Sequence, residues 1–208
     1  NKHNRNQKPQ NTMALKGQVT KASFLEWDSM LLLLQKLERD AEYKFQLLIA
    51  IGCYTGLRAG DLLKLRWCDV YGKVDDIEVV EGKTKKVRRI KINPNLAEII
   101  TRLHEKMNIS DDSELLFVNK TKVKAINVQY VNRKLKEIAL KYNLSIPTNS
   151  ISSHMFRKTL GRHVWAINNY SERSLTLLSD VFLHSSIKIT KIYLGIKAEE
   201  ISEVYLNL

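Results

Sequence analysis

Six side chains stand in an order that suits chemistry at phosphorus. They are Arg58, Lys83, His154, Arg157, His184 and Tyr193. Negative charge builds on the non-bridging oxygens of a phosphodiester while it is attacked, and fixed cations stabilise that charge. A tyrosine hydroxyl can act as the nucleophile that attacks the phosphorus. The set therefore predicts DNA strand cleavage through a covalent phosphotyrosine, with no metal and no other cofactor.

Arg58 follows a glycine break, at Gly56, and begins a predicted helix. Helix N-termini favour anions, so a guanidinium at this position would converge on a phosphate. Asp61, one turn further on, would instead hold Arg58 in a surface salt bridge. Both interpretations stay open for an isolated Thr-Gly-Leu-Arg segment.

Lys83 belongs to a strongly basic stretch between two predicted strands. The stretch contains Lys83, Lys85, Lys86, Arg88, Arg89 and Lys91, against the acidic Glu81. For most of these residues the simplest interpretation is a solvated hairpin that contacts the DNA backbone. The side chains that we assign to DNA phosphates are Lys85, Lys86, Arg88, Lys120, Lys122 and Lys124.

His154 and Arg157 are three positions apart and therefore neighbours on one helix face. An arginine can grip two phosphate oxygens at once, which suits Arg157 to a phosphodiester. Tyr193 follows His184 by nine positions, and Tyr170 and Tyr205 are rival nucleophiles.

This order of residues closely resembles the catalytic domain of the tyrosine recombinases, the phage-integrase family. The resemblance extends from about Ser23 to about Tyr205. It implies that Arg58 and Arg157 are the two catalytic arginines, and that Asp61 is the acidic support residue, whose carboxylate would orient Arg58 or a neighbouring base. It also implies that Tyr193 is the nucleophile, because the family places its tyrosine at this distance from the histidine.

The resemblance further implies a role for the remaining side chains. Lys83 would be the general acid that protonates the departing 5′ oxygen, with Lys85 as the alternative. His154 would be a hydrogen-bonding or proton-shuttling partner, and His184 would bind a non-bridging oxygen or position the tyrosine.

Two positions depart from the family pattern. Lys158 stands where the family usually has a histidine, and Leu183 stands where it often has a glycine before His184. Only glycine adopts left-handed backbone without a steric cost, so the turn at Leu183 must avoid that geometry or accept strain.

Composition sets the class of protein. The chain has 208 residues, 44% of them hydrophobic, and a net charge of +12 with a sequence pI near 9.6. Such an excess is expected of a protein that binds a polyanion. Cys53 and Cys68 sit in apolar segments and predict buried thiols in a reducing compartment. No apolar run approaches the ~20 residues of a membrane span, and no ligand spacing fits a metal site.

The pattern of elements predicts a mostly α fold with a small antiparallel β-sheet, an α+β domain. Residues 1–20 are basic and without apolar periodicity, so we expect a flexible linker or arm ahead of a catalytic domain at 21–208. Helices are predicted near 31–37, 43–54, 59–67, 95–107, 128–138, 153–168, 175–181 and 188–193, with strands at 77–80 and 87–92.

The last segment places Ile201, Val204, Tyr205 and Leu208 on one helical face. The resemblance implies that such a helix docks on an adjacent subunit, and packing within its own chain is the alternative. Family members also carry a further DNA-binding domain ahead of the catalytic one, and this chain has room only for a linker. We therefore expect a fragment of a longer protein.

The sequence thus predicts a site-specific recombinase that acts on double-stranded DNA as a homo-tetramer, with a monomer as the expected state without DNA. A prokaryotic or phage origin, a cytoplasmic and nucleoid-associated location and no membrane partner are expected. Two alternatives remain open, a type IB topoisomerase and a non-catalytic DNA-binding module.

Overall fold

The computed structural model describes residues 23–73, 75–82, 85–121 and 123–207. The predicted arm at 1–20, Lys83 and Lys122 lie outside these residues. No helix among the described residues is long and apolar enough to cross a membrane.

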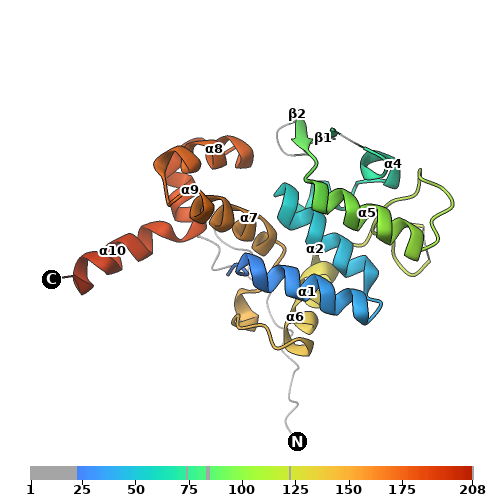
Figure 1. The fold of residues 1–208 in the computed structure, drawn as a ribbon, viewed down its shortest axis with the longest axis horizontal. Helices are drawn as coiled ribbons and strands as arrows, with labels where there is room; N and C mark the ends of the chain where they lie inside the picture. Colours follow the sequence, from blue (N-terminus) through green and yellow to red (C-terminus); the bar gives the residue numbers. More distant parts are fainter. Residues whose placement is uncertain (1–22, 74, 83–84, 122, 208) are drawn as a thin grey trace, which may run out of the picture.

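Helix α2 (Tyr43–Thr55) forms the centre of the larger hydrophobic core. It is buried on almost every side and contacts α1 (Trp27–Arg39), α5 (Pro94–Lys106) and α7 (His154–Ile167), as Figure 1 shows. Its near-continuous apolar sequence fits this position, because a helix that is apolar all round needs partners all round. A Cβ atom on Gly52 would lie 2.5 Å from the ring of Phe156. The small residue therefore lets α2 and α7 approach closely.

The small sheet is the hairpin of β1 (Asp76–Val80) and β2 (Val87–Lys91), which pair antiparallel with Val80 opposite Val87. The inner face carries Ile77, Val79 and Ile90, so side chains alternate between core and solvent as a one-sided sheet requires. Together with the helices, the hairpin confirms the predicted class, mostly α with a small antiparallel sheet.

A smaller core lies at the C-terminal end, where α8 (Glu172–Phe182) and α9 (Ile187–Leu194) pack on the second half of α7. Phe182 and Leu194 are almost completely buried there. Gly161 of α7 makes room for both, since a Cβ at that position would lie 2.5 Å from the Leu194 side chain. This packing joins the helix that carries Arg157 to the helix that carries Tyr193.

The other described elements of the body include α4 (Trp67–Val70), α6 (Val128–Lys141) and the 3₁₀ helix η1 (Thr148–Ser150). The predicted helix at 59–67 was too long, because α3 (Ala59–Leu62) ends after one turn. The chain then straightens, and Arg66 forms an isolated antiparallel bridge with Leu115.

The prediction that both cysteines are buried was half wrong, since Cys53 is buried but Cys68 is exposed.

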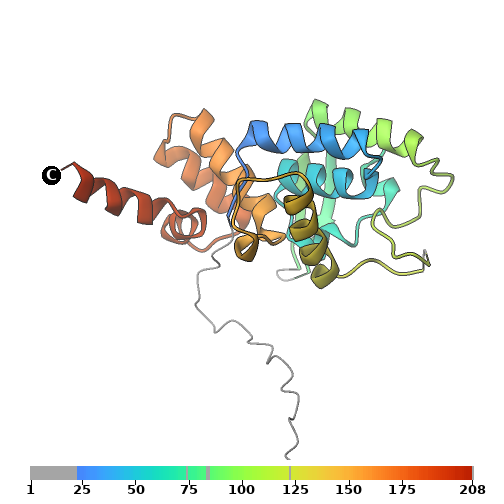
Figure 2. The same ribbon diagram turned by 90° about the horizontal axis from the view of Figure 1, so that it is seen from below.

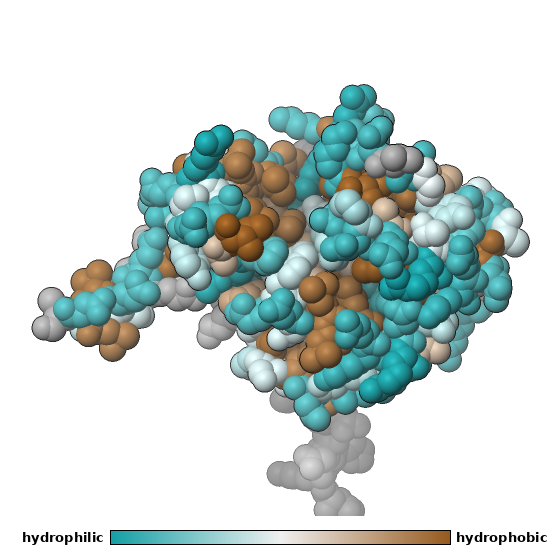
Figure 3. Space-filling model, in the orientation of Figure 1, coloured by the Kyte–Doolittle hydropathy of each residue, from teal (hydrophilic) through white to brown (hydrophobic). Residues whose placement is uncertain are grey.

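Helix α10 (Ile196–Leu206) leaves the body after Gly195 and projects away from it in both views (Figures 1 and 2). Ile196 is buried at its start, whereas Val204, Tyr205 and Leu206 are 63%, 73% and 82% exposed. In Figure 3, hydrophobic residues (brown) are therefore visible at the surface of the projecting helix.

Candidate active site

The predicted catalytic residues of the described chain line one cavity of about 510 Å³. Its walls include Arg58, His154, Arg157, His184 and Tyr193. Residues separated by up to 135 positions in the chain thus meet at one place (193 minus 58). Lys83 alone among the predicted catalytic residues lies outside the described residues.

The end of α2 positions Arg58. Gly56 closes the helix in the left-handed conformation with φ of 60°, and Leu160 would lie 2.8 Å from a Cβ there. A side chain at this position would meet both backbone strain and a clash. Arg58 follows as the extended residue that begins α3.

Arg157 is held by backbone carbonyls. Its Nη1 donates to the Gly56 oxygen at 2.5 Å and its Nη2 to the Phe182 oxygen at 3.0 Å. The Arg58 Nη2 also reaches the Phe182 oxygen, at 3.4 Å. Phe182 is the last residue of α8, where carbonyls lack helical partners and the helix dipole is negative. One helix end therefore draws both guanidiniums together.

The residue after Phe182 accepts backbone strain. Leu183 has φ of 52° and ψ of 45°, which is left-handed backbone in a non-glycine residue. That conformation costs a residue with a side chain about 1–2 kcal/mol. The turn is closed by the His184 N–H, which donates to the Ser179 oxygen at 2.9 Å. Of the two outcomes that the missing glycine left open, the turn takes the strained one.

His184 and Tyr193 form the far wall. His184 Nδ1 lies 2.9 Å from the Thr190 hydroxyl, and its ring meets the Tyr193 ring edge-on with centroids 5.2 Å apart. Ser186 caps α9 by accepting from the Ile189 N–H at 3.3 Å. The cap fixes the start of the helix and hence the distance from His184 to Tyr193.

Burial raises the pKa of Tyr193, and the nearby charges of Arg157 and Arg58 oppose that rise. The Tyr193 hydroxyl donates to the His154 backbone oxygen over a long 3.4 Å. His154 lines the cavity and is exposed. Partial desolvation by the surrounding protein lowers the pKa of its imidazole, and the charges of Arg157 and Lys158 lower it further. His154 is therefore mainly neutral at pH 7 and able to take up a proton.

Lys158 occupies the position where the tyrosine recombinases usually have histidine. Its side chain is buried, and its Nζ lies over the Tyr193 ring, 5.3 Å from the ring centre, which makes a cation–π contact. Burial lowers the pKa of this amine, and the charge of Arg162 adds to that effect.

Asp61 and Glu81, the two acidic residues of this region, bind different partners. The Asp61 carboxylate accepts from the Gly82 N–H at 2.8 Å, and so holds the turn ahead of Lys83. Glu81 pairs with Arg58 instead. Sequence reasoning missed Glu81, although an acid at the edge of a strongly basic stretch was a usable signal.

The predicted DNA contacts divide into two groups. Lys85, Lys86, Lys120 and Lys124 are exposed. Arg88 points inward, where its Nη2 donates to the Thr55 oxygen at 2.8 Å and its Nη1 lies 3.4 Å from the Glu81 carboxylate. Within the described residues, no group of three His, Cys, Asp or Glu side chains is placed to hold a metal ion.

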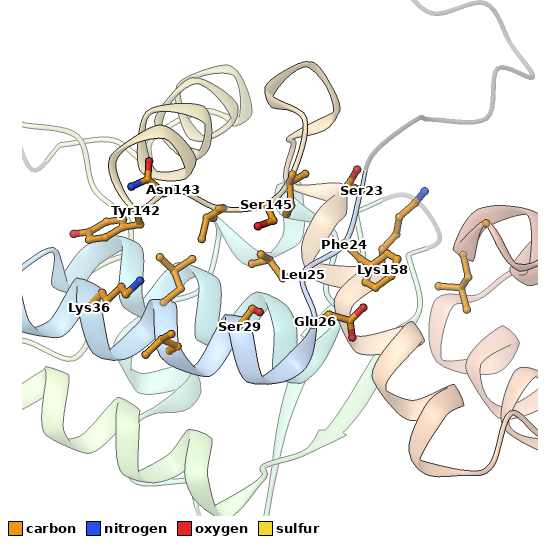
Figure 4. A pocket seen from close by; sticks show the side chains of 16 residues that line it. Ser23, Phe24, Leu25, Glu26, Ser29, Lys36, Tyr142, Asn143, Ser145 and Lys158 are labelled. Carbon is orange, nitrogen blue, oxygen red and sulfur yellow. The ribbon is translucent and has the colours of Figure 1, made fainter. Parts of the chain in front are cut away.

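A second cavity, of about 530 Å³, shares α7 and the end of α9 with the first. Figure 4 shows Phe24, Leu25, Glu26 and Ser29 at the start of α1 on one side and Tyr142 to Ser145, after α6, on the other. Lys158 lines this cavity too. The amine that contacts the Tyr193 ring is therefore also at the wall of a groove outside the active site.

Comparison with known proteins identifies the family and the fold. The model of the Phage integrase family matches residues 23–200. The solved structure of XerA recombinase is similar with a TM-score of 0.66 and 20% identity, over 88% of this chain and 64% of that one. A lambda integrase (75–356) dimer bound to a COC′ core site gives a TM-score of 0.61 at 19% identity, over 88% and 62%.

The catalytic domain of bacteriophage HP1 integrase is similar with a TM-score of 0.53 and 20% identity, over 84% of this chain and 88% of that one. The chain thus spans most of that single domain but less than two thirds of XerA recombinase. No curated protein matches the sequence.

Proposed function

Since this chain belongs to the Phage integrase family, we propose that it is the catalytic domain of a site-specific DNA recombinase. The reaction is integrative or excisive strand exchange through a 3′-phosphotyrosyl intermediate. The observation that carries the proposal is the single cavity in which two arginines and two histidines surround Tyr193.

In the first step the Tyr193 oxygen attacks the scissile phosphorus. A bond from phosphorus to the tyrosine oxygen forms, and the bond from phosphorus to the 5′ oxygen breaks. The phenolic proton passes to His154, whose lowered pKa leaves the imidazole neutral. Lys83 gives a proton to the departing 5′ oxygen. In the second step the 5′-hydroxyl of the new strand attacks the phosphorus, and the bond from phosphorus to the Tyr193 oxygen breaks. The hydroxyl proton passes to Lys83, and His154 returns a proton to Tyr193. The number of phosphodiester bonds is therefore conserved and no ATP is consumed.

The chain's own cations stabilise the charge that develops during both steps. Arg58 and Arg157 converge on one carbonyl, so their remaining N–H groups serve one phosphate. His184 donates to a non-bridging oxygen. Loss of one such donor typically lowers the rate by about 10²–10³-fold. This supply of positive charge is why we propose a metal-independent reaction.

The proposed substrate is double-stranded DNA. The net charge of +12 attracts the duplex, and Lys85, Lys86, Lys120 and Lys124, which are exposed, would contact backbone phosphates. Arg88, which is turned inward, is removed from that set.

Covalent capture tests the proposed chemistry. A duplex with a nick close to the cleavage site loses its short 5′-hydroxyl fragment, so an adduct accumulates instead of rejoining. We expect the unsubstituted chain to form an adduct at Tyr193. Tyr193→Phe should form none while binding DNA with an unchanged Kd, because only the attacking oxygen is removed.

An adduct that persists in Tyr193→Phe, or that maps to Tyr205 or Tyr170, would contradict the assignment of the nucleophile. Absence of any adduct with tight DNA binding would favour a non-catalytic DNA-binding module. Relaxation of supercoils without exchange between two sites would favour a type IB topoisomerase.

We further propose that the protein assembles as a tetramer on DNA and that α10 docks on the neighbouring subunit. The exposed Val204, Tyr205 and Leu206 at the end of the projecting helix support this arrangement, because a cluster of large exposed apolar side chains marks a surface that binds a partner. Truncation before Ala198 should weaken cooperative assembly on a paired site more than binding to one half-site. Unchanged assembly together with a lower melting temperature would instead mean that α10 packs within its own chain.

A further inference from the structure

Glu81 is a fully buried carboxylate in a strongly basic part of the chain. Its side chain is 0% exposed, and it forms ion pairs with Arg58 and with Arg88. A buried carboxylate is costly unless charged partners compensate for the lost water. The two guanidiniums provide that compensation and leave the trio with a net positive charge.

The backbone of the same residue closes the turn that carries Lys83. The Glu81 N–H donates to the Lys86 oxygen at 3.0 Å, and the Glu81 oxygen accepts from the Lys85 N–H at 2.8 Å. The same residue therefore contributes its backbone to the turn and its carboxylate to Arg58. Arg88 fixes the other side of the carboxylate to α2 through the Thr55 oxygen.

The other contacts of Arg58 hold it less firmly. Its hydrogen bond to the Phe182 oxygen measures 3.4 Å, which is long for a guanidinium donor. Asp61 is committed to the Gly82 N–H. Among the contacts of Arg58 described here, the charge-assisted bond to Glu81 is therefore the strongest restraint on a guanidinium that is 27% exposed and lines the cavity.

We propose that Glu81 is a positioning residue that orients Arg58 toward the scissile phosphate and links it to the turn carrying Lys83. Glu81 does not line the cavity and so acts through Arg58. The inference rests on the proposed function, since it assumes cleavage of a phosphodiester. It adds a specific restraint, distinct from Asp61, that joins a stabilising cation to the leaving-group acid.

The test compares two substrates in single-turnover cleavage by the whole 208-residue chain at saturating DNA. One carries the normal scissile phosphodiester. The other carries a methylphosphonate, in which a neutral methyl group replaces one charged non-bridging oxygen. Arg58 acts on that charge, so a defect that works through Arg58 must shrink when the charge is absent.

On the normal substrate we expect Glu81→Gln to slow cleavage on the order of 10-fold to 100-fold, the size of a loss from small misplacement of a catalytic group. The Kd for DNA should change by less than about threefold, because the charge grows mainly in the transition state. On the methylphosphonate the rates of Glu81→Gln and of the unsubstituted chain should agree within about threefold. This substrate lacks the oxygen charge that a correctly oriented Arg58 would stabilise.

Glu78→Gln is the matched control. Glu78 lies on β1, three residues before Glu81, is exposed and pairs with Arg89, so its loss should leave both rates unchanged. The double variant Glu81→Gln/Arg88→Gln removes one negative and one positive charge together. It should cleave as slowly as Glu81→Gln, because Arg58 still lacks its carboxylate.

Three outcomes would overturn the inference. They are a normal rate in Glu81→Gln, an equal defect on both substrates, and full recovery in the double variant, which would reduce Glu81 to charge balance. If Glu81→Gln does not fold, the substrate comparison in the double variant or in Glu81→Asp decides in the same way. Failure of the proposed function is distinct, because the unsubstituted chain would then form no adduct on either substrate.

Discussion

The two sides of the active site are held by different forces. On the helical side, formed by α7, α8 and α9, Arg157 is buried and donates to two backbone carbonyls. On the hairpin side, formed by Arg58 and the turn at 81–86, the restraints are ion pairs among Arg58, Glu81 and Arg88. Backbone carbonyls are fixed by the fold itself, whereas ion pairs depend on the side chains that meet. The helical side should therefore couple catalysis to stability, and the hairpin side should separate them.

The largest effect expected on the hairpin side is that of Lys83→Ala. It should slow cleavage of a normal phosphodiester by about 10²–10⁴-fold, the usual range for loss of a general acid. A substrate with sulfur at the 5′-bridging position releases a thiolate, which needs no proton, and should be cleaved at close to the unsubstituted rate. Single-turnover adduct formation on both substrates measures this.

Lys85→Ala is the control for that comparison, since Lys85 is exposed on the same turn. It should leave the ratio of the two rates unchanged. Equal defects of Lys83→Ala on both substrates would mean that Lys83 only binds the DNA backbone. Rescue by sulfur in Lys85→Ala instead would transfer the role to Lys85.

The two arginines provide the direct test of the comparison. Arg157→Met and Arg58→Met should each slow cleavage by about 10²–10³-fold, because each removes one donor to the phosphate. Arg157→Met should also lower the free energy of unfolding by about 2–4 kcal/mol, since the buried Gly56 carbonyl loses its donor and the Phe182 carbonyl keeps only the long bond from Arg58. Arg58→Met should cost less, about 1–2 kcal/mol, because its guanidinium is partly exposed and Glu81 keeps Arg88 as a partner.

Urea unfolding measures the loss of unfolding free energy in each variant, and single-turnover cleavage measures the loss of rate. Together they show whether the two losses occur separately on the hairpin side. A similar loss of unfolding free energy in both would remove the distinction between the two sides. A large loss in Arg58→Met alone would reverse it.

Local sequence spacing predicted the helical side better than the hairpin side. The separation of three positions from His154 to Arg157 was enough to place both at the start of one helix, and the fold class followed from periodicity. The spacing could not show that Phe182 would bind both arginines, because partners 124 and 25 positions apart meet only through tertiary packing.

The hairpin side shows the same limit for charged residues. Asp61 was the nearer acid to Arg58 in sequence, yet the tertiary fold brings Glu81 to the guanidinium from 23 positions away. The split of the predicted helix at 59–67 has a similar cause. Arg66 is drawn into a bridge with Leu115 and into a capping box with Asp69, and no local propensity encodes the first of these.

The smallest effect expected lies at Leu183, where the helical side accepts backbone strain. Leu183→Val should lower the unfolding free energy by about 1 kcal/mol more than Leu183→Asn does, because β-branched residues fit left-handed backbone worst and asparagine is tolerated there. The two side chains are similar in size, and asparagine is the more polar, so burial alone predicts the opposite order at a residue that is 37% exposed. Thermal melts should separate the variants by about 2–4 °C for a domain of this length.

The His184 turn should survive in both variants, so their cleavage rates should differ little. Equal melting temperatures, or a lower one for Leu183→Asn, would show that the strain at Leu183 is not what sets the stability of this turn, and the backbone of the helical side would then be less constrained than its carbonyl contacts imply.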